Sequence, residues 1–330
     1  MEVTIKDVAK LAGVSVATIS RVLNNSAVVS PETTDRVNDA IKTLNYRPNF
    51  LGRNLRKRET NVILALIPST EHTYYSEILH GMQHTASEFG YDILMSTTNS
   101  YLQREQHLLK MLSNRTVDAA VLMGTRLDKE ALDELTKYNH VALCCEALAN
   151  SDILTVTIDN EKAAYDAVSY LISIGHKKIA MVSTEVRAPS SISRENGYLR
   201  ALNENNIPFN EKYLFRGSYD YSSGCDALDL FMRLDEKPTA VFAVSDFLAA
   251  GVLKKTSELN IKAGRDFSVM GFDNISMADI YTPSISTIEQ PCYKMGQTVS
   301  ELVIENISGK KNSGKIILPH RLVLRQSTGD

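Results

Sequence analysis

The stretch AGVSVATISRVLNN, residues 12–25, places a glycine between two short segments that have the apolar spacing of helices. Gly13 can end the first segment, because glycine adopts the left-handed conformation of a helix C-cap without a steric cost. Ser15 then suits the N-cap of a second helix. The apolar stripe of that helix is Ile19, Val22 and Leu23. The stretch therefore predicts two helices joined by a tight turn.

The residues on either side of this stretch complete a three-helix unit. Thr4 and Asp7 have the spacing of a capping box at the start of the first helix. The apolar positions that follow are Val8, Leu11 and Ala12. Ser30 and Pro31 suit the N-cap and the first turn of a third helix. Helix, glycine turn, helix and supporting helix is the arrangement of a helix-turn-helix domain, although the spacing alone also fits a three-helix bundle that binds no DNA.

The distribution of charge favours the DNA-binding alternative. Residues 1–58 contain ten Lys and Arg but five Asp and Glu, a net charge of +5. The whole chain of 330 residues carries −3, so residues 59–330 carry −8. A basic N-terminal segment on an acidic body is expected where one end of a chain meets phosphate.

The outward side chains of the second helix can be assigned to DNA groups. The residues at the start of a recognition helix face base edges in the major groove. Val16 and Ala17 suit contact with thymine methyl groups, and Arg21 suits a bidentate pair with guanine. The polar residues expected at phosphates are Ser15, Thr18, Asn24 and Tyr46.

Two longer stretches carry a resemblance to a known family. They are TIKDVAKLAGVSVATISRVLN (4–24) and VSPETTDRVNDAIKTLNYRPN (29–49). Together they resemble, without a gap, the headpiece of LacI/GalR-type transcription regulators. The resemblance implies that residues 15–24 form the recognition helix. The Val16–Ala17 pair resembles the galactose-repressor and catabolite-control branch, which implies an operator with a central C·G step.

The segment NFLGRNLRKRE, residues 49–59, joins the headpiece to the rest of the chain. The family resemblance implies a hinge helix that forms on DNA and inserts Leu55 into the minor groove, a known way of kinking DNA. A flexible basic linker is the alternative. Gly52 stands where the family usually has alanine, and glycine costs a helix about 1 kcal/mol, so we expect a hinge that depends strongly on DNA to fold. The full expected DNA-binding set is Thr4, Ser15, Val16, Ala17, Thr18, Arg21, Asn24, Tyr46, Arg53, Asn54, Leu55 and Arg56.

From residue 61 onward, apolar runs alternate with amphipathic stretches. The runs expected to be strands are NVILALIP, YDILMSTT, DAAVLM, HVALCC, ILTVTID, KKIAMVST, TAVFAVSD and FSVMGFD. Amphipathic stretches such as 76–89 and 161–174 separate them, so the pattern predicts an α/β fold with doubly wound parallel sheets in two lobes. Ligands of such sheets bind beyond the carboxyl ends of the strands.

This region is similar to the periplasmic-binding-protein-like type I core of the same family, in segments such as SRENGYLRAL and FSVMGFDNI. The resemblance implies a headpiece (1–48), a hinge (49–60), an N-terminal lobe (61–160 plus 292–321) and a C-terminal lobe (161–291). No heptad-repeat helix follows at the C-terminus, so we expect a homodimer rather than a tetramer.

The resemblance also implies an effector site between the lobes. The candidate residues are Ser69, Tyr74, Tyr75, Asp159, Ser190, Arg194, Tyr219, Asp246 and Asp273. A carboxylate such as Asp273 binds vicinal hydroxyls, and the guanidinium of Arg194 donates two parallel hydrogen bonds. Three structural alternatives remain open: Arg194 and Asp273 pair with each other or with the backbone as structure, Tyr219 only packs, and Asp246 caps a helix.

Other classes of protein find less support in the sequence. It contains no P-loop, no nucleotide-binding glycine motif and no nucleophile elbow, so we expect neither an enzyme nor a bound cofactor. His80 and His84 lie four residues apart without an evident third metal ligand, and we expect no metal site. The four cysteines form no C-x-x-C motif and are expected to be free, buried thiols. The charged N-terminus lacks a signal-peptide pattern, which argues against a periplasmic transport protein and for a cytoplasmic location without membrane contact.

We therefore expect a transcription regulator, most simply a repressor, that binds a double-stranded operator and is controlled by a small effector such as a sugar. Two alternatives concern the effector. One is a nucleoside or purine. The other is a phosphorylated carrier protein, used as corepressor by the catabolite-control branch through basic residues. Ser300 and Glu301 fill that stretch here, and an acid would repel a phosphoserine.

Overall fold

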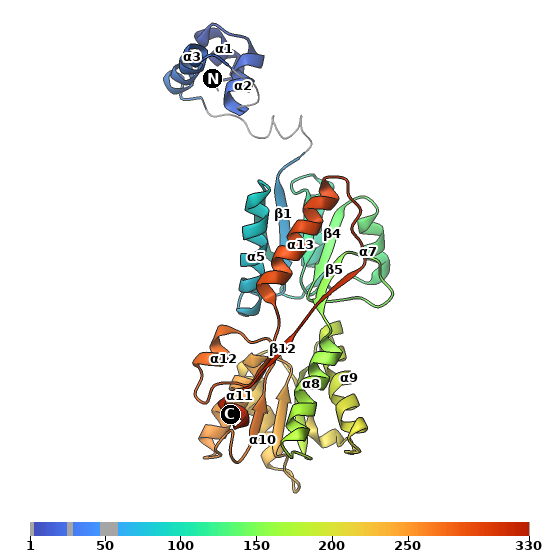
Figure 1. Ribbon diagram of the computed structural model, residues 1–330. Helices are drawn as coiled ribbons and strands as arrows, with labels where there is room; N and C mark the ends of the chain where they lie inside the picture. The colour runs from blue at the N-terminus through green and yellow to red at the C-terminus, as the bar shows by residue number, and fades with distance from the viewer. Residues whose placement is uncertain (1–2, 25–28, 47–58, 330) are drawn as a thin grey trace. The chain divides into compact units, whose positions relative to one another are not determined.

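The computed structural model, drawn in Figure 1, describes residues 3–24, 29–46 and 59–329. These residues form two compact units, one ending at Glu59 and one beginning at Thr60. Each unit has a hydrophobic core of its own.

The first unit contains the three expected helices, α1 (Ile5–Ala12), α2 (Val16–Asn24) and α3 (Pro31–Thr43). The carboxylate of Asp7 accepts hydrogen bonds from the backbone N–H and the hydroxyl of Thr4, and Gly13 ends α1 in the left-handed conformation with φ +66°. The Oγ of Ser15 accepts from the N–H of Thr18, and that of Ser30 accepts from the N–H of Thr33. The caps predicted from the sequence are thus confirmed.

The core of this unit is small. Its fully buried large side chains are Val8, Ile19 and Val37, one from each helix. Leu11, which the helical spacing placed with the apolar residues, is wrongly predicted, because its side chain is 53% exposed. Leu11 follows Val8 by three positions, and a helix this short buries only a narrow stripe.

The second unit contains two parallel sheets, and the expected α/β class with doubly wound lobes is confirmed. The N-terminal sheet has the strand order β11-β5-β4-β3-β1-β2. Its strands are β1 (Val62–Ile67), β2 (Asp92–Thr97), β3 (Ala119–Leu122), β4 (His140–Cys144), β5 (Thr155–Ile158) and β11 (Lys315–Leu318). The helices on it are α5 (Tyr74–Glu88), α6 (Leu102–Ser113), α7 (Lys129–Thr136) and α13 (Cys292–Ile307).

The alternation of buried side chains along β1 shows how this sheet is covered on both faces. Ile63 and Ala65 belong to the same core cluster as Ile78 of α5 and Met295 of α13. Leu64 and Leu66 belong to a second cluster with residues of α6 and α7. A parallel sheet buried on both faces needs such continuous apolar strands.

The C-terminal sheet has the order β7-β6-β8-β9. Its strands are β6 (Ile179–Thr184), β7 (Leu214–Gly217), β8 (Ala240–Ala243) and β9 (Ser268–Met270). The surrounding helices are α8 (Asn160–Ser173), α9 (Pro189–Glu204), α10 (Tyr221–Met232), α11 (Asp246–Glu258) and α12 (Ser276–Ile280), with two short 3-10 turns, η1 (Glu211–Tyr213) and η2 (Gln326–Thr328). Helix α8 packs on α9, and α10 packs on α11.

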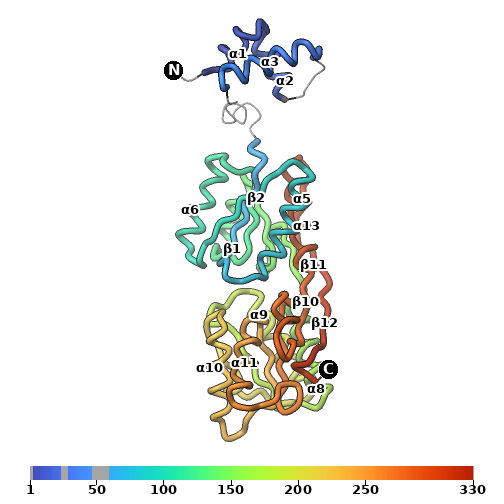
Figure 2. Tube along the Cα trace, turned by 90° about the vertical axis from the view of Figure 1, so that its left-hand side faces the viewer, coloured from blue at the N-terminus to red at the C-terminus, as the bar shows by residue number. Residues whose placement is uncertain are grey.

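The chain passes between the lobes more than once, as the trace in Figure 2 shows. It enters the C-terminal lobe between β5 and α8, and returns between β10 (Thr287–Glu289) and α13. After β11, β12 (Arg321–Val323) pairs antiparallel with β10, and η2 packs beside β9. The sequence patterns do not predict β7, β10, β11 and β12, because these strands are short and several of their side chains are exposed.

Glycines let helices approach one another closely in both lobes. A Cβ atom on Gly81 of α5 would lie 2.0 Å from the carbonyl oxygen of Tyr293 in α13, and one on Gly296 of α13 would lie 2.0 Å from that of Ile78. In the C-terminal lobe, a Cβ on Gly224 of α10 would lie 2.2 Å from the carbonyl oxygen of Leu248 in α11. The missing side chains thus set the distance between helix axes.

Candidate functional site

A cavity of about 690 Å³ lies between the two lobes of the second unit. Its walls are the loops that follow β1, β2, β3 and β4 of the N-terminal sheet and β6, β7 and β9 of the C-terminal sheet. These loops are the carboxyl ends of parallel strands, where open α/β sheets bind ligands, and the volume falls in the range of small-molecule sites.

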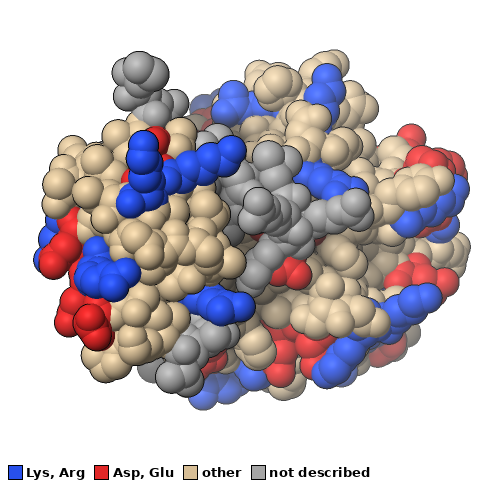
Figure 3. All heavy atoms as spheres, turned by 90° about the horizontal axis from the view of Figure 1, so that it is seen from above, with Lys and Arg blue, Asp and Glu red and all other residues tan. Residues whose placement is uncertain are grey.

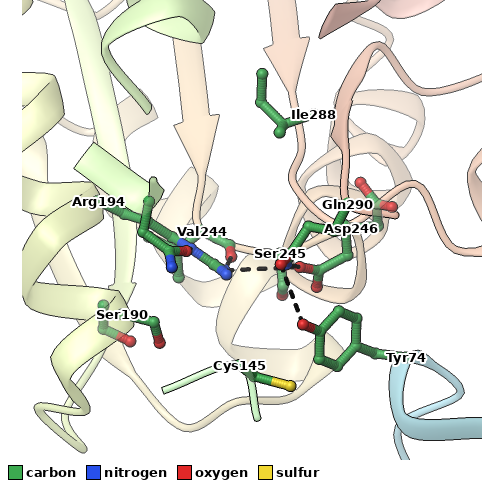
Figure 4. Close-up of polar contacts among 12 residues, drawn as sticks. Tyr74, Cys145, Ser190, Arg194, Val244, Ser245, Asp246, Ile288 and Gln290 are labelled. Atoms are coloured by element: carbon green, nitrogen blue, oxygen red, sulfur yellow. Dashed lines mark hydrogen bonds and ion pairs between the residues drawn. The ribbon is translucent and has the colours of Figure 1, made fainter. Parts of the chain in front are cut away.

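Arg194 of α9 is buried in the wall of this cavity, and contacts with other residues of the C-terminal lobe fix its position. Its side chain is 7% exposed, and it donates to Oδ1 of Asn160 at 2.9 Å and to the carbonyl oxygen of Val244 at 2.6 Å. The guanidinium carbon lies 3.7 Å from the ring centre of Phe272. Burial disfavours the cation and lowers the Arg194 pKa, but the neighbouring groups Asp273, Tyr219, Tyr74 and Glu146 together outweigh burial, so the net shift is upward. Figure 4 shows Arg194 extending toward Val244.

Asp273 faces Arg194 across the site. One carboxylate oxygen lies 3.7 Å from Nη1 of Arg194 and accepts from Nε2 of Gln290 at 2.7 Å, and the other accepts from the hydroxyl of Tyr219 at 3.2 Å. Burial raises the pKa of Asp273 to about 6, against the lowering effect of these partners. Its φ of +111° is unusual for a residue other than glycine, so the loop holds this carboxyl in a strained conformation.

The network continues into the N-terminal lobe. The hydroxyl of Tyr74, the first residue of α5, donates to Oε1 of Gln290 at 3.1 Å. Gln290 therefore connects Tyr74 with Asp273, and Figure 4 shows Tyr74 and Gln290 on the same side of the site. Burial raises the pKa of Tyr74 well above its ordinary value, so the phenol remains a neutral hydrogen-bond donor.

Seven of the nine residues proposed for effector binding line the cavity. They are Ser69, Tyr74, Tyr75, Ser190, Arg194, Tyr219 and Asp273. Of the alternatives that the sequence left open, the pairing of Arg194 with Asp273 is present, and Tyr219 both packs and donates to Asp273. All three of these residues still face the cavity.

Two of the proposed residues do not line it. Asp159 is exposed and caps α8 by accepting from the N–H of Lys162 at 2.9 Å. Asp246 is 1% exposed and points away from the cavity, toward the N–H of Ile275 and the hydroxyl of Thr287. The structure therefore does not bring either residue to the cavity that the other seven share. Each lies at a helix start, where a carboxylate has backbone donors close at hand.

Asp246 has a supporting role instead. By accepting from Ile275 it fixes the loop that carries Asp273, while the cap of α11 is provided by Ser245, whose Oγ accepts from the N–H of Leu248. The alternative that Asp246 itself caps the helix is therefore wrong. Burial, together with the nearby charge of Asp273, raises the Asp246 pKa well above its ordinary value.

Sequence reasoning missed several residues of the site. His72 and Glu146 line the cavity, and Asn160 and Gln290 orient Arg194 and Asp273. Glu146 accepts from the N–H of Ser190 at 2.8 Å and from its hydroxyl at 2.6 Å. Both His72 and Glu146 follow predicted parallel strands, so a systematic survey of loops after strands would have found them.

In the first unit, α2 presents Ala17 and Arg21 as exposed side chains. Val16 is half-buried because it packs on the headpiece core, and Tyr46 packs there as well. Thr4 and Ser15 are exposed, and both engage in capping contacts. The described Lys and Arg of this unit are all exposed: Lys6, Lys10, Arg21, Arg36 and Lys42. Figure 3 shows the molecule from above, with Lys and Arg side chains interspersed with Asp and Glu among larger uncharged areas.

The hinge residues Gly52, Arg53, Asn54, Leu55 and Arg56 lie outside the described residues, as does the side chain of Asn24. Within the described part of the chain, no group of His, Cys, Asp and Glu side chains is suited to a metal ion. His84 instead bonds the hydroxyl of Tyr293 through Nδ1 at 2.9 Å. The four cysteines are free, but Cys225 is only partly buried, contrary to expectation. None of the described helices is long and apolar enough to cross a membrane.

Comparison with known proteins relates both units to one family. Residues 4–49 match the family described as "Bacterial regulatory proteins, lacI family", and residues 60–326 match "Periplasmic binding proteins and sugar binding domain of LacI family". The chain is 35% identical over 331 residues to catabolite control protein A of Priestia megaterium, covering 99% of this chain and 100% of that protein. It is 34% identical to the transcriptional repressor CytR of Escherichia coli K12, covering 98% and 96%.

Solved structures give the same result. The lac repressor dimer bound to operator and the anti-inducer ONPF superimposes with a TM-score of 0.89 at 25% identity, covering 99% of both chains. The complex of the transcriptional regulator CelR with cellobiose gives a TM-score of 0.74 at 27% identity, covering 99% and 100%. With a helix-turn-helix unit, a two-lobed α/β core and both family matches, this chain belongs to the LacI family of bacterial transcription regulators.

Proposed function

We propose that the protein is a repressor whose affinity for its operator is controlled by a small polyhydroxylated ligand, a sugar, bound between the lobes. The observation that carries this proposal is the buried pair of Arg194 and Asp273 in the wall of a 690 Å³ cavity. A carboxylate accepts from adjacent hydroxyls and a guanidinium donates to ring and hydroxyl oxygens. CelR, which is similar over the whole chain, was solved with cellobiose.

The same proposal includes the mode of DNA binding. Two copies of the chain form a homodimer that binds a pseudo-palindromic operator. The side chains of Val16, Ala17 and Arg21 contact base edges. Phosphates are contacted by Ser15, Thr18, Asn24 and Tyr46, and Leu55 of the hinge wedges between base pairs. The headpiece (1–48), the hinge (49–60) and the lobe boundaries given above belong to this proposal. Binding is expected to weaken steeply with salt.

A change in the angle between the lobes transmits the ligand signal. The two lobes contribute opposite walls of the cavity, so a ligand that contacts both favours one relative orientation. In the dimer this orientation sets the spacing of the two hinges and hence the operator affinity. The protein acts on the chromosome in the cytoplasm and catalyses no reaction. All relatives described above are transcription regulators, which supports this.

Thermal-shift screening tests the ligand class. The full-length protein is heated with monosaccharides, disaccharides, sugar phosphates and nucleosides, because a ligand that binds the folded state raises the melting temperature. One sugar is expected to stabilise the wild type and the exposed-site control Asp266→Ala, but not Asp273→Ala. Tyr219→Phe is a milder second probe if Asp273→Ala folds poorly. Stabilisation by nucleosides alone would show that the effector is a nucleoside and not a sugar. Stabilisation of Asp273→Ala by the same sugar would show that the sugar does not bind at Asp273.

A protein corepressor is a second candidate, favoured by the 35% identity to catabolite control protein A. The stretch concerned lies on α13, where Ser300 is fully buried and donates to the carbonyl oxygen of Met82, and Glu301 is exposed. An exposed acid repels a phosphoserine, so we expect no binding of a serine-phosphorylated carrier protein by the wild type in a titration. Measurable binding would establish this second function, and Glu301→Arg should then strengthen it.

A further inference from the structure

His72 is a residue of the cavity wall that neither the sequence motifs nor the proposed function uses. It lies in the loop between β1 and α5, in the N-terminal lobe. Its ring nevertheless packs against two aromatic rings of the C-terminal lobe. The ring centres of His72 and Tyr219 are 4.8 Å apart at an interplanar angle of 76°, and those of His72 and Phe247 are 5.6 Å apart at 88°.

These edge-to-face contacts bridge the opening between the lobes. Tyr219 follows β7 and Phe247 is the second residue of α11, so both belong to the lobe opposite His72. Aromatic pairs at such distances and angles stabilise an interface beyond the area they bury. Moving the lobes apart would separate these rings, so the contacts exist only when the cavity is closed.

The same side chain also destabilises the closed arrangement, because one of its polar atoms is buried without a hydrogen-bond partner in the described part of the chain. Nδ1 of His72 is buried and has no hydrogen-bond partner among the described residues. A buried nitrogen without a partner loses its hydrogen bond to water and forms no hydrogen bond within the protein, which raises the free energy of the closed form. When the lobes separate, water can reach this nitrogen again, so closing the empty cavity is penalised at this position.

We propose that His72 is a clasp that sets the balance between the open and closed cavity. Its aromatic contacts stabilise the closed form, and its unpaired nitrogen holds that form close in free energy to the open one. A small difference between two states is what allows a ligand to switch them. His72 is thus a positioning residue for the proposed effector site. The inference uses that site but requires no particular ligand.

The charges around the imidazole determine how the clasp responds to acid. Burial lowers the His72 pKa, while Glu71 on its own loop and Asp220 at the start of α10 act in the opposite direction without cancelling it. Tyr219 faces the ring as a neutral phenol, and on α11 the carboxylate of Asp246 is engaged with Ile275 and Thr287. The closed form therefore prefers neutral His72, and protonation as the pH falls through the ordinary histidine range favours opening.

Distance measurements between the lobes test this without a ligand. Tyr101 and Glu185 are exposed and do not line the cavity, but each directly follows a lining residue, Ser100 in the N-terminal lobe and Thr184 in the C-terminal lobe. Nitroxides on Tyr101→Cys and Glu185→Cys, in a full-length chain with Cys225→Ser and diluted with unlabelled protein, report the closed-to-open ratio by pulsed electron spin resonance. For the wild type we expect this ratio to fall at least threefold between pH 8 and pH 5.5.

Two substitutions at the same position should act in opposite directions. His72→Phe keeps the ring contacts and removes the unpaired nitrogen, so the closed form should gain at least threefold and lose its pH dependence. His72→Ala removes the contacts and should favour the open form. His140→Phe is the control, because desolvation also lowers the pKa of His140, but this residue is exposed at the start of β4 and does not line the cavity.

An unchanged ratio in His72→Phe, or a pH dependence that survives it, would overturn the proposal. The same change in His140→Phe would overturn it too, because the effect would then not be specific to His72. Failure of every sugar in the thermal-shift screen would leave these distance results standing, so the two proposals fail separately. A melting curve of each variant confirms that it is folded.

Discussion

The two lobes of the core share one plan of parallel strands and covering helices but treat the cavity between them differently. The C-terminal lobe contributes buried charges, Arg194 and Asp273, fixed by Asn160, Val244 and Tyr219. The N-terminal lobe lines the same cavity with hydroxyl and aromatic side chains, Ser69, Tyr74 and Tyr75, and with residues near the rim such as Arg126, which is exposed.

This difference teaches which lobe is organised before a ligand arrives. Charges buried in the C-terminal lobe are costly unless their partners are already in place, so that lobe must hold the recognition geometry rigidly. The N-terminal lobe can approach and withdraw, because its hydroxyl and aromatic groups are neutral and its charged residues at the cavity, such as Glu146 and Arg126, are only half-buried or exposed. The following predictions test this comparison between a C-terminal lobe that is rigid before a ligand binds and an N-terminal lobe that moves.

The largest effect is expected from breaking the buried charge pair. Arg194→Met should destabilise the core by about 3–5 kcal/mol, because it leaves the buried Asp273 without its cation. Tyr74→Phe in the N-terminal lobe removes one hydrogen bond to Gln290 and should cost only about 1 kcal/mol. Urea unfolding of the two variants measures both. Equal losses would contradict the contrast between the lobes.

A middle-sized effect should be the same in both lobes. Gly81→Ala at the α5–α13 contact and Gly224→Ala at the α10–α11 contact force a methyl group against a backbone carbonyl. Each should destabilise its lobe by about 1–3 kcal/mol through overpacking. Gly90→Ala is the control, because nothing lies within 4 Å of its Cβ position, although its φ of +76° strains an alanine.

Hydrogen exchange resolved by segment shows where the glycine variants act. Loss of protection confined to the substituted lobe would mean that the lobes unfold separately. Loss of protection in both lobes would mean that they unfold as one unit. The description of a rigid C-terminal lobe and an independently moving N-terminal lobe would then need revision.

The pH dependence of stability should differ once Asp246 is neutralised. The raised pKa of buried Asp246 means that the folded state binds a proton more tightly than the unfolded state. Stability from this group is therefore present below its unfolded pKa and declines as the pH rises through the folded one. Asp246→Asn removes this decline and can still accept from Ile275, so its unfolding free energy should vary less between pH 4 and pH 8. An unaltered pH profile would disprove this assignment.

The smallest effects should come from helix caps at the surface of each lobe. Asp128→Ala removes the acceptor for the N–H of Ala131 at the start of α7, and Asp220→Ala removes that for Ser223 at α10. Each should lower the free energy of unfolding by about 1 kcal/mol. Paired thermal melts measure the difference, and a loss of several kcal/mol at Asp220 would reveal a role beyond capping.

Local sequence signals predicted much of this protein. Capping residues such as Thr4, Ser15 and Ser30 mark helix starts, because the side chain and its backbone partner lie within one turn. The apolar runs of central strands such as β1, β3 and β8 mark parallel sheets for a similar reason, since burial on both faces requires continuous hydrophobicity. The short strands at the sheet edges and between the lobes escaped notice, because half-exposed residues weaken that signal.

For the site, the sequence by itself determined which residue types follow the strands, and the family resemblance marked seven side chains that line one cavity. Only the tertiary structure decided that Asp159 and Asp246 turn away, and that His72 crosses to the opposite lobe. A carboxylate at a helix start can face a ligand or a nearby N–H, and the sequence is the same in both cases. The choice depends on donors brought close by residues far away in the chain, such as Ile275, and that proximity exists only after folding.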